Sequence, residues 1–135
     1  PADVGNPHAV VVLDDHESVT GMDLTSAPAW SPAEAFPEGV NVEFVRQVGP
    51  THVQMRVFER GVGETLSCGT GTVAVAAVMA RRTGDLGPWR VDVPGGRITV
   101  ELAQSQNGEM QASLTGPAVL VAQGEVHIPD DVVSR

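Results

Sequence analysis

Lysine is absent from this sequence of 135 residues, and cysteine occurs only once. All eight basic residues are arginine. Without a lysine, the chain cannot form a Schiff base with pyridoxal phosphate, and it cannot provide the lysine of a phosphate-binding loop. The single cysteine, Cys68, excludes both an internal disulfide and a zinc site built from several cysteines.

Positive charge and long apolar runs are scarce as well. Seventeen acidic residues against eight basic ones give a formal net charge of -9, and the isoelectric point of the sequence lies near 4.6. A field of that sign repels phosphate, so we expect neither a nucleic acid nor an anionic membrane as a partner. The longest uninterrupted apolar run, Val73–Ala80, is too short to span a bilayer.

The size and composition are those of one folded domain or of a part of one. Hydrophobic residues make up 41% of the chain and the mean hydropathy is 0.00, which is not the composition of a disordered chain. The chain begins with Pro1 rather than Met and shows no signal-peptide pattern. We therefore expect either a processed protein or a piece of a longer one.

Alternation of apolar and polar residues predicts strands over most of the chain. The β-branched run Ala9–Leu13 predicts a buried strand. Further strands are expected at residues 40–44, 52–59, 89–93, 97–102, 110–114 and 119–122. Pro94-Gly95-Gly96 and Asn107-Gly108 fall between such runs and predict two hairpins. Residues 14–38 are predicted to form a loop with one short helical turn, where Ser31–Glu34 has the spacing of a capping box.

One long helix is expected at residues 73–82, and it has no polar face until its end. A helix that is apolar all round is normally enclosed by other elements. Arg81 and Arg82 suit the negative end of the helix dipole, and Gly84 provides a stop. The sequence therefore predicts an α+β fold in which a largely antiparallel sheet wraps one central buried helix.

Cys68 is the most informative residue, because it stands at the mouth of this helix and directly before Gly69-Thr70-Gly71. The unpaired N–H groups and the partial positive charge of a helix N-terminus favour a thiolate over a thiol. The same N–H groups can hold an anion such as a carboxylate, and glycine allows it to approach closely. The segment therefore predicts an acid/base sulfur beside an anion-binding site. The alternative is a structural, buried cysteine next to a glycine-rich turn.

The segment Gly69–Ala74 also fits the G-x-G-x-x-A pattern of dinucleotide-binding folds. That pattern requires a strand that runs directly into the first glycine, whereas polar turn residues precede it here. It also requires a parallel strand–helix–strand unit, whereas the hairpin at Pro94-Gly95-Gly96 returns the chain antiparallel. We therefore do not expect a bound nucleotide.

Several polar side chains outside this segment are candidate ligands for a small molecule. Glu59 and Arg60 close a strand, where arginine could bind a substrate carboxylate and glutamate a substrate ammonium; the alternative is a solvated strand end. Asn6 and His8 stand on either side of a proline, and a plain turn with a surface histidine is the alternative. Asn41 is an amide within an apolar strand, where an outward polar position is the alternative. The remaining histidines lack metal-ligand spacing and are expected at the surface: His16, His52 and His127.

Four motifs together resemble the diaminopimelate epimerase family. They are Gly5-Asn6-Pro7-His8, residues 37–42, residues 56–65, and Ser67-Cys68-Gly69-Thr70-Gly71-Thr72. Their order and spacing match, Gly116-Pro117-Ala118 fits a late strand of the family, and the resemblance covers nearly the whole chain. It implies a fold of two similar domains, each a mixed sheet rolled around a central helix, with the substrate in the cleft between them. Residues 1–135 resemble the second, C-terminal catalytic domain, which we expect to be incomplete at its N-terminus.

The resemblance implies an epimerase that interconverts LL- and meso-diaminopimelate without pyridoxal phosphate, metal or other cofactor, in the biosynthesis of lysine and peptidoglycan precursors. In the family, two cysteines act on opposite faces of the substrate α-carbon, one as the base and one as the acid. By this resemblance Cys68 is one of the two, and Glu59 and His8 assist it. The implied substrate ligands are Asn6, Asn41, Glu59, Arg60, Gly69 and Thr70. The first-domain cysteine motif has no counterpart here, so we expect the 135 residues alone to have little or no activity.

Some expectations about partners and alternatives stay open. A homodimer is implied by the family alone. A free cysteine of low pKa requires a reducing compartment, which favours the cytoplasm. The alternatives to a diaminopimelate epimerase are another cofactor-independent amino-acid racemase, which would take a different substrate, and a non-catalytic module that binds a small molecule.

Overall fold

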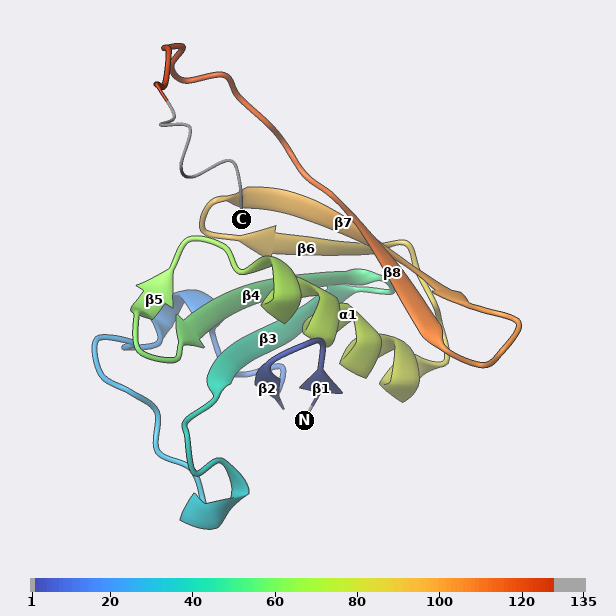
Figure 1. Ribbon diagram of the computed structural model, residues 1–135. Helices are drawn as coiled ribbons and strands as arrows, with labels where there is room; N and C mark the ends of the chain where they lie inside the picture. Colours follow the sequence, from blue (N-terminus) through green and yellow to red (C-terminus); the bar gives the residue numbers. More distant parts are fainter. Residues whose placement is uncertain (1, 128–135) are drawn as a thin grey trace.

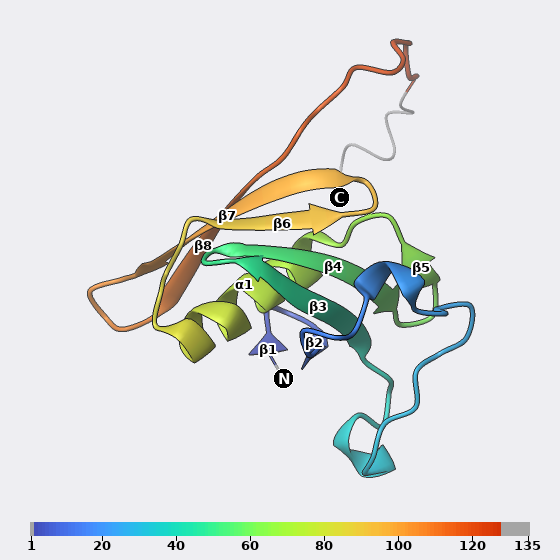
Figure 2. The ribbon, with the colours of Figure 1, turned by 180° about the vertical axis from the view of Figure 1, so that it is seen from behind.

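The computed structural model describes residues 2–127. Its one long helix, α1 (Gly69–Thr83), lies against a twisted sheet that curls around it (Figure 1, Figure 2). The strands of the sheet are β1 (Ala2–Asp3), β2 (Pro7–Val12), β3 (Asn41–Gly49), β4 (His52–Glu59), β5 (Gly63–Thr65), β6 (Trp89–Val93), β7 (Gly96–Gln104) and β8 (Met110–Thr115). The α+β fold predicted from the sequence, with a sheet wrapped around one helix, is confirmed.

The sheet is mixed. Its strand order is β1-β2-β3-β4-β6-β7-β8, and β5 pairs with β4 beside this path. The pairs β2–β3 and β4–β6 are parallel, and the other pairs are antiparallel. The long connection between the parallel strands β2 and β3 contains two 3-10 turns, η1 (Val19–Gly21) and η2 (Ala33–Ala35). Since η1 lies against β3 and β4 on the side away from α1, the middle of the sheet is covered on both faces (Figure 2).

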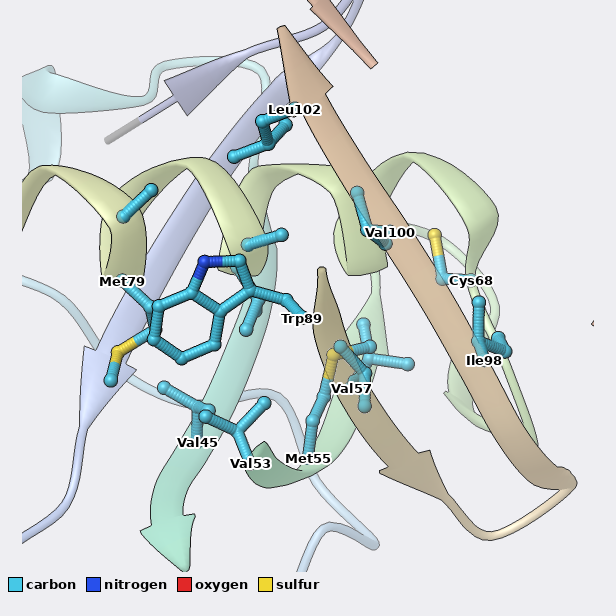
Figure 3. Packing of buried hydrophobic residues seen from close by; sticks show 14 residues of the cluster. Val45, Val53, Met55, Val57, Cys68, Met79, Trp89, Ile98, Val100 and Leu102 are labelled. Atoms are coloured by element: carbon cyan, nitrogen blue, oxygen red, sulfur yellow. The ribbon is translucent and has the colours of Figure 1, made fainter. Parts of the chain in front are cut away.

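The apolar core lies between α1 and the sheet (Figure 3). In β4, Val53, Met55 and Val57 point into this core, whereas the side chains between them do not. This alternation confirms the prediction for residues 52–59. Trp89, at the start of β6, is fully buried in the same core, and its indole N–H donates to the carbonyl of Asp85 at 3.0 Å. A buried tryptophan with its one polar atom satisfied makes a large contribution to packing.

The helix is longer than predicted, because it begins directly after Cys68. It ends as predicted at Gly84, whose backbone is left-handed (φ +79°) and whose N–H donates to the carbonyl of Ala80 at 2.8 Å. Val78 is only partly buried, so the helix is not enclosed on every side as its all-round apolar sequence predicted. Within residues 2–127, no helix has the length and apolar character that crossing a membrane requires.

Three local predictions are wrong. Residues 119–122 form no strand; they belong to an extended segment that leaves the sheet, and they are exposed (Figure 1). The strand predicted at Ala9–Leu13 is present, from Pro7 to Val12, but most of its side chains are partly exposed, so the prediction that it is buried is wrong. The capping box at Ser31–Glu34 is not formed, since Pro32 caps the turn η2 without a side-chain hydrogen bond. The two predicted hairpins, β6–β7 and β7–β8, are confirmed.

Candidate active site

Four segments that are distant in sequence meet at one end of the sheet. The strands β2 and β3 are parallel, so their beginnings lie side by side and His8 pairs with Asn41. The strand β4 is antiparallel to β3, which brings its last residue, Glu59, to the same end. The first turn of α1 also lies there, because Gly71 contacts the side chain of Glu43 on β3. The fold therefore gathers the motifs that the sequence analysis singled out.

Asn41 connects two of these segments through its side chain. Its Oδ1 accepts a hydrogen bond from the backbone N–H of Arg60 at 2.9 Å, and its Nδ2 donates to the carbonyl of Pro7 at 3.5 Å. The side chain is buried, which excludes an outward polar position. Asn41 thus holds the start of β2 and the loop after β4 in a fixed relation.

Arg60 lies along the wall of a cleft. Its Nη1 donates to the carbonyl of Glu38 at 3.2 Å. Gly39 packs beneath its aliphatic part, with φ at +82° and with space so limited that a Cβ would lie 3.0 Å from Cδ of Arg60. Both the backbone conformation and the close approach require glycine at this position. The residues that line the cleft are Gly5, Asn6, Pro7, Ala35, Phe36, Pro37, Glu38, Gly39 and Arg60.

Glu59 is the last residue of β4 and directly precedes Arg60, which lines this cleft. Its carboxylate accepts a hydrogen bond from the hydroxyl of Thr65 on β5. The side chain is half-buried, so one of its faces remains accessible. The adjacent Glu59 and Arg60 therefore present opposite charges at one end of the sheet, as the sequence predicted.

Cys68 is the residue that caps the start of α1, as its sequence position predicted. Its Sγ lies 3.5 Å from the hydroxyl of Thr70, and its carbonyl accepts the backbone N–H and the hydroxyl of Thr72. The side chain caps none of the helix N–H groups, and Gly69 and Thr70 are exposed. The first-turn N–H groups are therefore oriented towards any anion that approaches this end of the helix.

The sulfur is less accessible than the sequence predicted. Cys68 is only 8% exposed and packs at the edge of the apolar core beside Ile98 and Val100 (Figure 3). It does not line the cleft that contains Asn6 and Arg60. The structure thus brings together Asn6, His8, Asn41 and Arg60 through direct contacts. It places Cys68, Gly69 and Thr70 at the neighbouring helix start.

Glu43, a residue that the sequence analysis missed, connects the residues at the cleft with the start of the helix. The carboxyl group of Glu43 lies 2.6 Å from Nδ1 of His8, measured from its Oε1, and both side chains have 0% exposure. On the other side of the ring, Nε2 of His8 lies 3.1 Å from Oδ1 of Asn6. His8 is therefore no surface histidine; it is the middle of a buried polar chain that ends at the cleft.

Burial raises the pKa of Glu43 to about 8, and the nearby charge of Glu59 acts in the same direction. The helix packs directly on this acid, because a Cβ at Gly71 would lie 2.6 Å from Oε1 of Glu43. The sequence does indicate that Glu43 belongs to the site. Glu43 follows Asn41 at a spacing of two in the strand, which places both on one face.

Among the other histidines, His52 also departs from its prediction. Its Nε2 lies 2.8 Å from Asp92, and it is partly buried where β4 and β6 pair. His16 and His127 are exposed, as predicted. In the part of the chain that the structure describes, no three His, Cys, Asp or Glu side chains gather closely enough to hold a metal ion.

Comparison with known proteins shows which family the sequence matches. The model of the family "Diaminopimelate epimerase" matches residues 2–121. The diaminopimelate epimerase of Streptomyces coelicolor is 50% identical over 129 residues, which covers 90% of this chain and 43% of that protein. The diaminopimelate epimerase of Rhodococcus opacus is 49% identical, and the match covers 92% of this chain and 42% of that protein. The one of Paraburkholderia xenovorans is 41% identical, and the match covers 94% of this chain and 43% of that protein. The chain therefore spans less than half the length of these curated relatives.

A solved structure shares the fold. It is that of a protein from Pseudomonas aeruginosa described as a predicted epimerase, and it superposes with a TM-score of 0.50 at 16% identity. The match covers 78% of this chain and 36% of that one, and it bears on the fold alone. The family model, in contrast, covers most of the sequence, and the relatives share about half of its residues. On these grounds the chain belongs to the diaminopimelate epimerase family.

Proposed function

We propose that this chain carries one half of the catalytic site of an isomerase that interconverts LL- and meso-diaminopimelate without a cofactor. One observation carries the proposal: Asn6 and Arg60 line a single cleft. Asn41 holds two parts of its wall together by bonding to Pro7 and to the backbone of Arg60, and the helix start with Cys68 lies at the same end of the sheet. The names of the relatives support the choice of substrate, because each is a diaminopimelate epimerase.

The charges at this end of the sheet suit a substrate with zwitterionic ends. Arg60 can bind a carboxylate, and the adjacent Glu59 can bind an ammonium group. The N–H groups of Gly69 and Thr70, at the positive end of α1, can bind the α-carboxylate beside Cys68. Fixed dipoles at this position stabilise the negative charge that spreads into the carboxylate when the α-proton leaves.

In the proposed reaction, the sulfur of Cys68 exchanges a proton with one face of the α-carbon. A thiolate takes the α-proton and becomes a thiol, or a thiol delivers its proton and becomes a thiolate. Inversion requires a second acid/base group on the opposite face. Cys68 is the only cysteine of the sequence, so in a two-cysteine mechanism the second one must come from outside these 135 residues. We place the enzyme in the cytoplasm, because a free catalytic cysteine requires a reducing compartment.

The test is a chimera in which this chain is joined to the part of the Streptomyces coelicolor relative that it does not match. The release of α-deuterium from labelled diaminopimelate is then measured for the chimera, for the 135-residue chain alone, and for the Cys68→Ser chimera. We expect turnover by the chimera, little or none by the chain alone, and a loss of about a thousandfold on Cys68→Ser. Ser67→Ala, at the exposed neighbouring residue, is the matched control.

Other outcomes would reassign the function. Undiminished turnover by the Cys68→Ser chimera would assign a non-catalytic binding role to this chain. Turnover of another amino acid from a panel, with diaminopimelate left unchanged, would assign a different racemase of the same superfamily.

A further inference from the structure

A buried chain of polar groups runs from the core of the sheet to the cleft. It begins at Glu43 on β3, passes through the ring of His8 on β2 and ends at Asn6, one of the residues that line the cleft. The two contacts are 2.6 Å and 3.1 Å long. Each atom in this chain is either a donor or an acceptor, so the proton at one end decides what the other end presents to the cleft.

The position of the first proton follows from the surroundings of Glu43. Its Oε1 contacts His8, and within the described part of the chain its Oε2 is buried without a hydrogen-bond partner. An ionised carboxylate would leave a charged oxygen buried and unpaired, which is costly, whereas the carbonyl oxygen of a neutral acid loses much less. The raised pKa of Glu43 agrees with this assignment. Oε1 therefore carries a proton and donates it to Nδ1 of His8.

The remaining assignments are then fixed. When Nδ1 of His8 accepts, the ring proton must lie on Nε2, which donates to Oδ1 of Asn6. Asn6 lines the cleft, and with its Oδ1 engaged by His8 its amide nitrogen, with two N–H donors, is the group that it can offer there. We propose that Glu43 is a positioning residue, a neutral acid that sets the tautomer of His8 and thereby turns the donor side of Asn6 towards the bound substrate. This inference rests on the proposed function, in which Asn6 is a substrate ligand.

Loss of the Glu43 proton would exchange the donor and acceptor roles of the hydrogen bonds that link Glu43, His8 and Asn6. The carboxylate would then accept from Nδ1–H of His8, and the lone pair of Nε2 would face Oδ1 of Asn6. Two acceptors repel each other, so the amide would rotate and present its oxygen to a substrate carboxylate. The groups that face Glu43 are His8 on β2, Glu59 at the end of β4 and the first turn of α1 at Gly71. Apart from the ring of His8 itself, these groups of residues 2–127 include no cationic side chain that would keep the carboxylate ionised.

The first test is nitrogen NMR of the 135-residue chain with labelled histidine, with His8→Gln used to assign the signals. At neutral pH we expect His8 to carry its proton on Nε2 and to accept at Nδ1. Glu43→Gln keeps a neutral N–H donor at this position, so the same tautomer should persist to higher pH. Glu43→Leu removes the donor and should abolish the preference. A proton on Nδ1 in the unaltered chain at neutral pH would overturn the proposal.

The second test is the kinetics of the chimera. Glu43→Gln should keep kcat/KM within about threefold and remove its decline at alkaline pH, whereas Glu43→Leu should lower kcat/KM by about tenfold, mainly through KM. The control is Glu101→Gln on the exposed surface of β7, which should leave both parameters unchanged. Equal losses in the Gln and Leu variants would refute the role of the neutral acid. A chimera that leaves diaminopimelate unchanged would refute the proposed function, while the tautomer of His8 would still decide the role of Glu43.

Discussion

The two halves of β3 pack against the same helix with opposite chemistry. At its beginning, Asn41 and Glu43 are buried polar residues that bond to β2 and to the loop after β4. Two residues further along, Val45 belongs to the apolar core with Met79 of the helix. Buried polar groups add little net stability and are costly when a partner is lost, whereas buried apolar groups stabilise the fold directly. One end of this strand therefore forms part of the candidate site, and the other end belongs to the core that holds the site in position.

The largest expected effect tests the apolar half. Trp89 is fully buried in the core, so Trp89→Ala should lower the free energy of unfolding by about 3–5 kcal/mol. The control is Trp30→Ala, because Trp30 is exposed. Within residues 2–127, its one aromatic contact is an edge-on contact with Phe36. Denaturant unfolding of the three chains measures both changes. Equal losses at the two tryptophans would mean that the core is not where the stability resides.

A smaller effect is expected where the helix packs on the polar half. A Cβ at Gly71 would lie 2.6 Å from Glu43, so Gly71→Ala should lower the free energy of unfolding by about 1–3 kcal/mol. Gly69→Ala is the matched control, since a Cβ at that glycine meets nothing within 4 Å. Combining Gly71→Ala with Glu43→Ala removes the clash. A double-mutant cycle that shows no coupling between the two positions would contradict the contact.

The sequence predicted most of the apolar half. The alternation in β4, the two hairpins and the stop of α1 at Gly84 follow from local patterns, and the structure confirms them. The strand predicted at residues 119–122 shows the limit of such patterns. Alternation tells which residues suit burial, but it does not tell whether a neighbouring strand is present to pair with them.

The polar half was predicted only where motifs mark it. Asn6, His8, Asn41 and Arg60 belong to such motifs, and the structure brings them into contact. Glu43 was missed because an acid in an alternating strand is normally read as a solvent-facing residue. That reading fails here, since α1 covers one face of the sheet and the connection after β2 covers the other. Burial on both faces is a property of the tertiary fold, which one strand's sequence does not contain.

The pH dependence of stability should also differ between the two ends of the sheet. In the folded state the pKa of Glu43 is raised from its ordinary value of 4.5 to about 8. Between these values the unfolded chain is ionised at this residue while the folded chain keeps its proton, so stability falls as the pH rises from 4.5 towards 8. One group contributes a slope of at most about 1.4 kcal/mol per pH unit. Glu43→Gln should remove this slope in unfolding curves recorded across that range.

Asp92, on β6, provides the opposite case and serves as the control. Hydrogen bonds from Arg97 and then His52 lower its pKa from 3.8 to about 2. The stability that ionised Asp92 adds to the folded state is present above pH 3.8 and is lost as the pH falls towards 2. Asp92→Asn should therefore flatten only the acid side of the plot of stability against pH. If the stability of the Glu43→Gln variant still falls between pH 4.5 and 8, a group other than Glu43 causes that pH dependence.

The smallest effect is expected at a valine that lies outside both halves. Val121 is 90% exposed, whereas Val45 is fully buried between the sheet and α1. Val121→Thr should therefore change the free energy of unfolding of this chain by less than about 0.5 kcal/mol. The same substitution at Val45 places a hydroxyl in the apolar core and should cost about 1–3 kcal/mol. The two substitutions are chemically identical, so any difference between them measures burial alone. A large loss at Val121 would mean that the extended segment packs on the sheet in solution, contrary to its exposure.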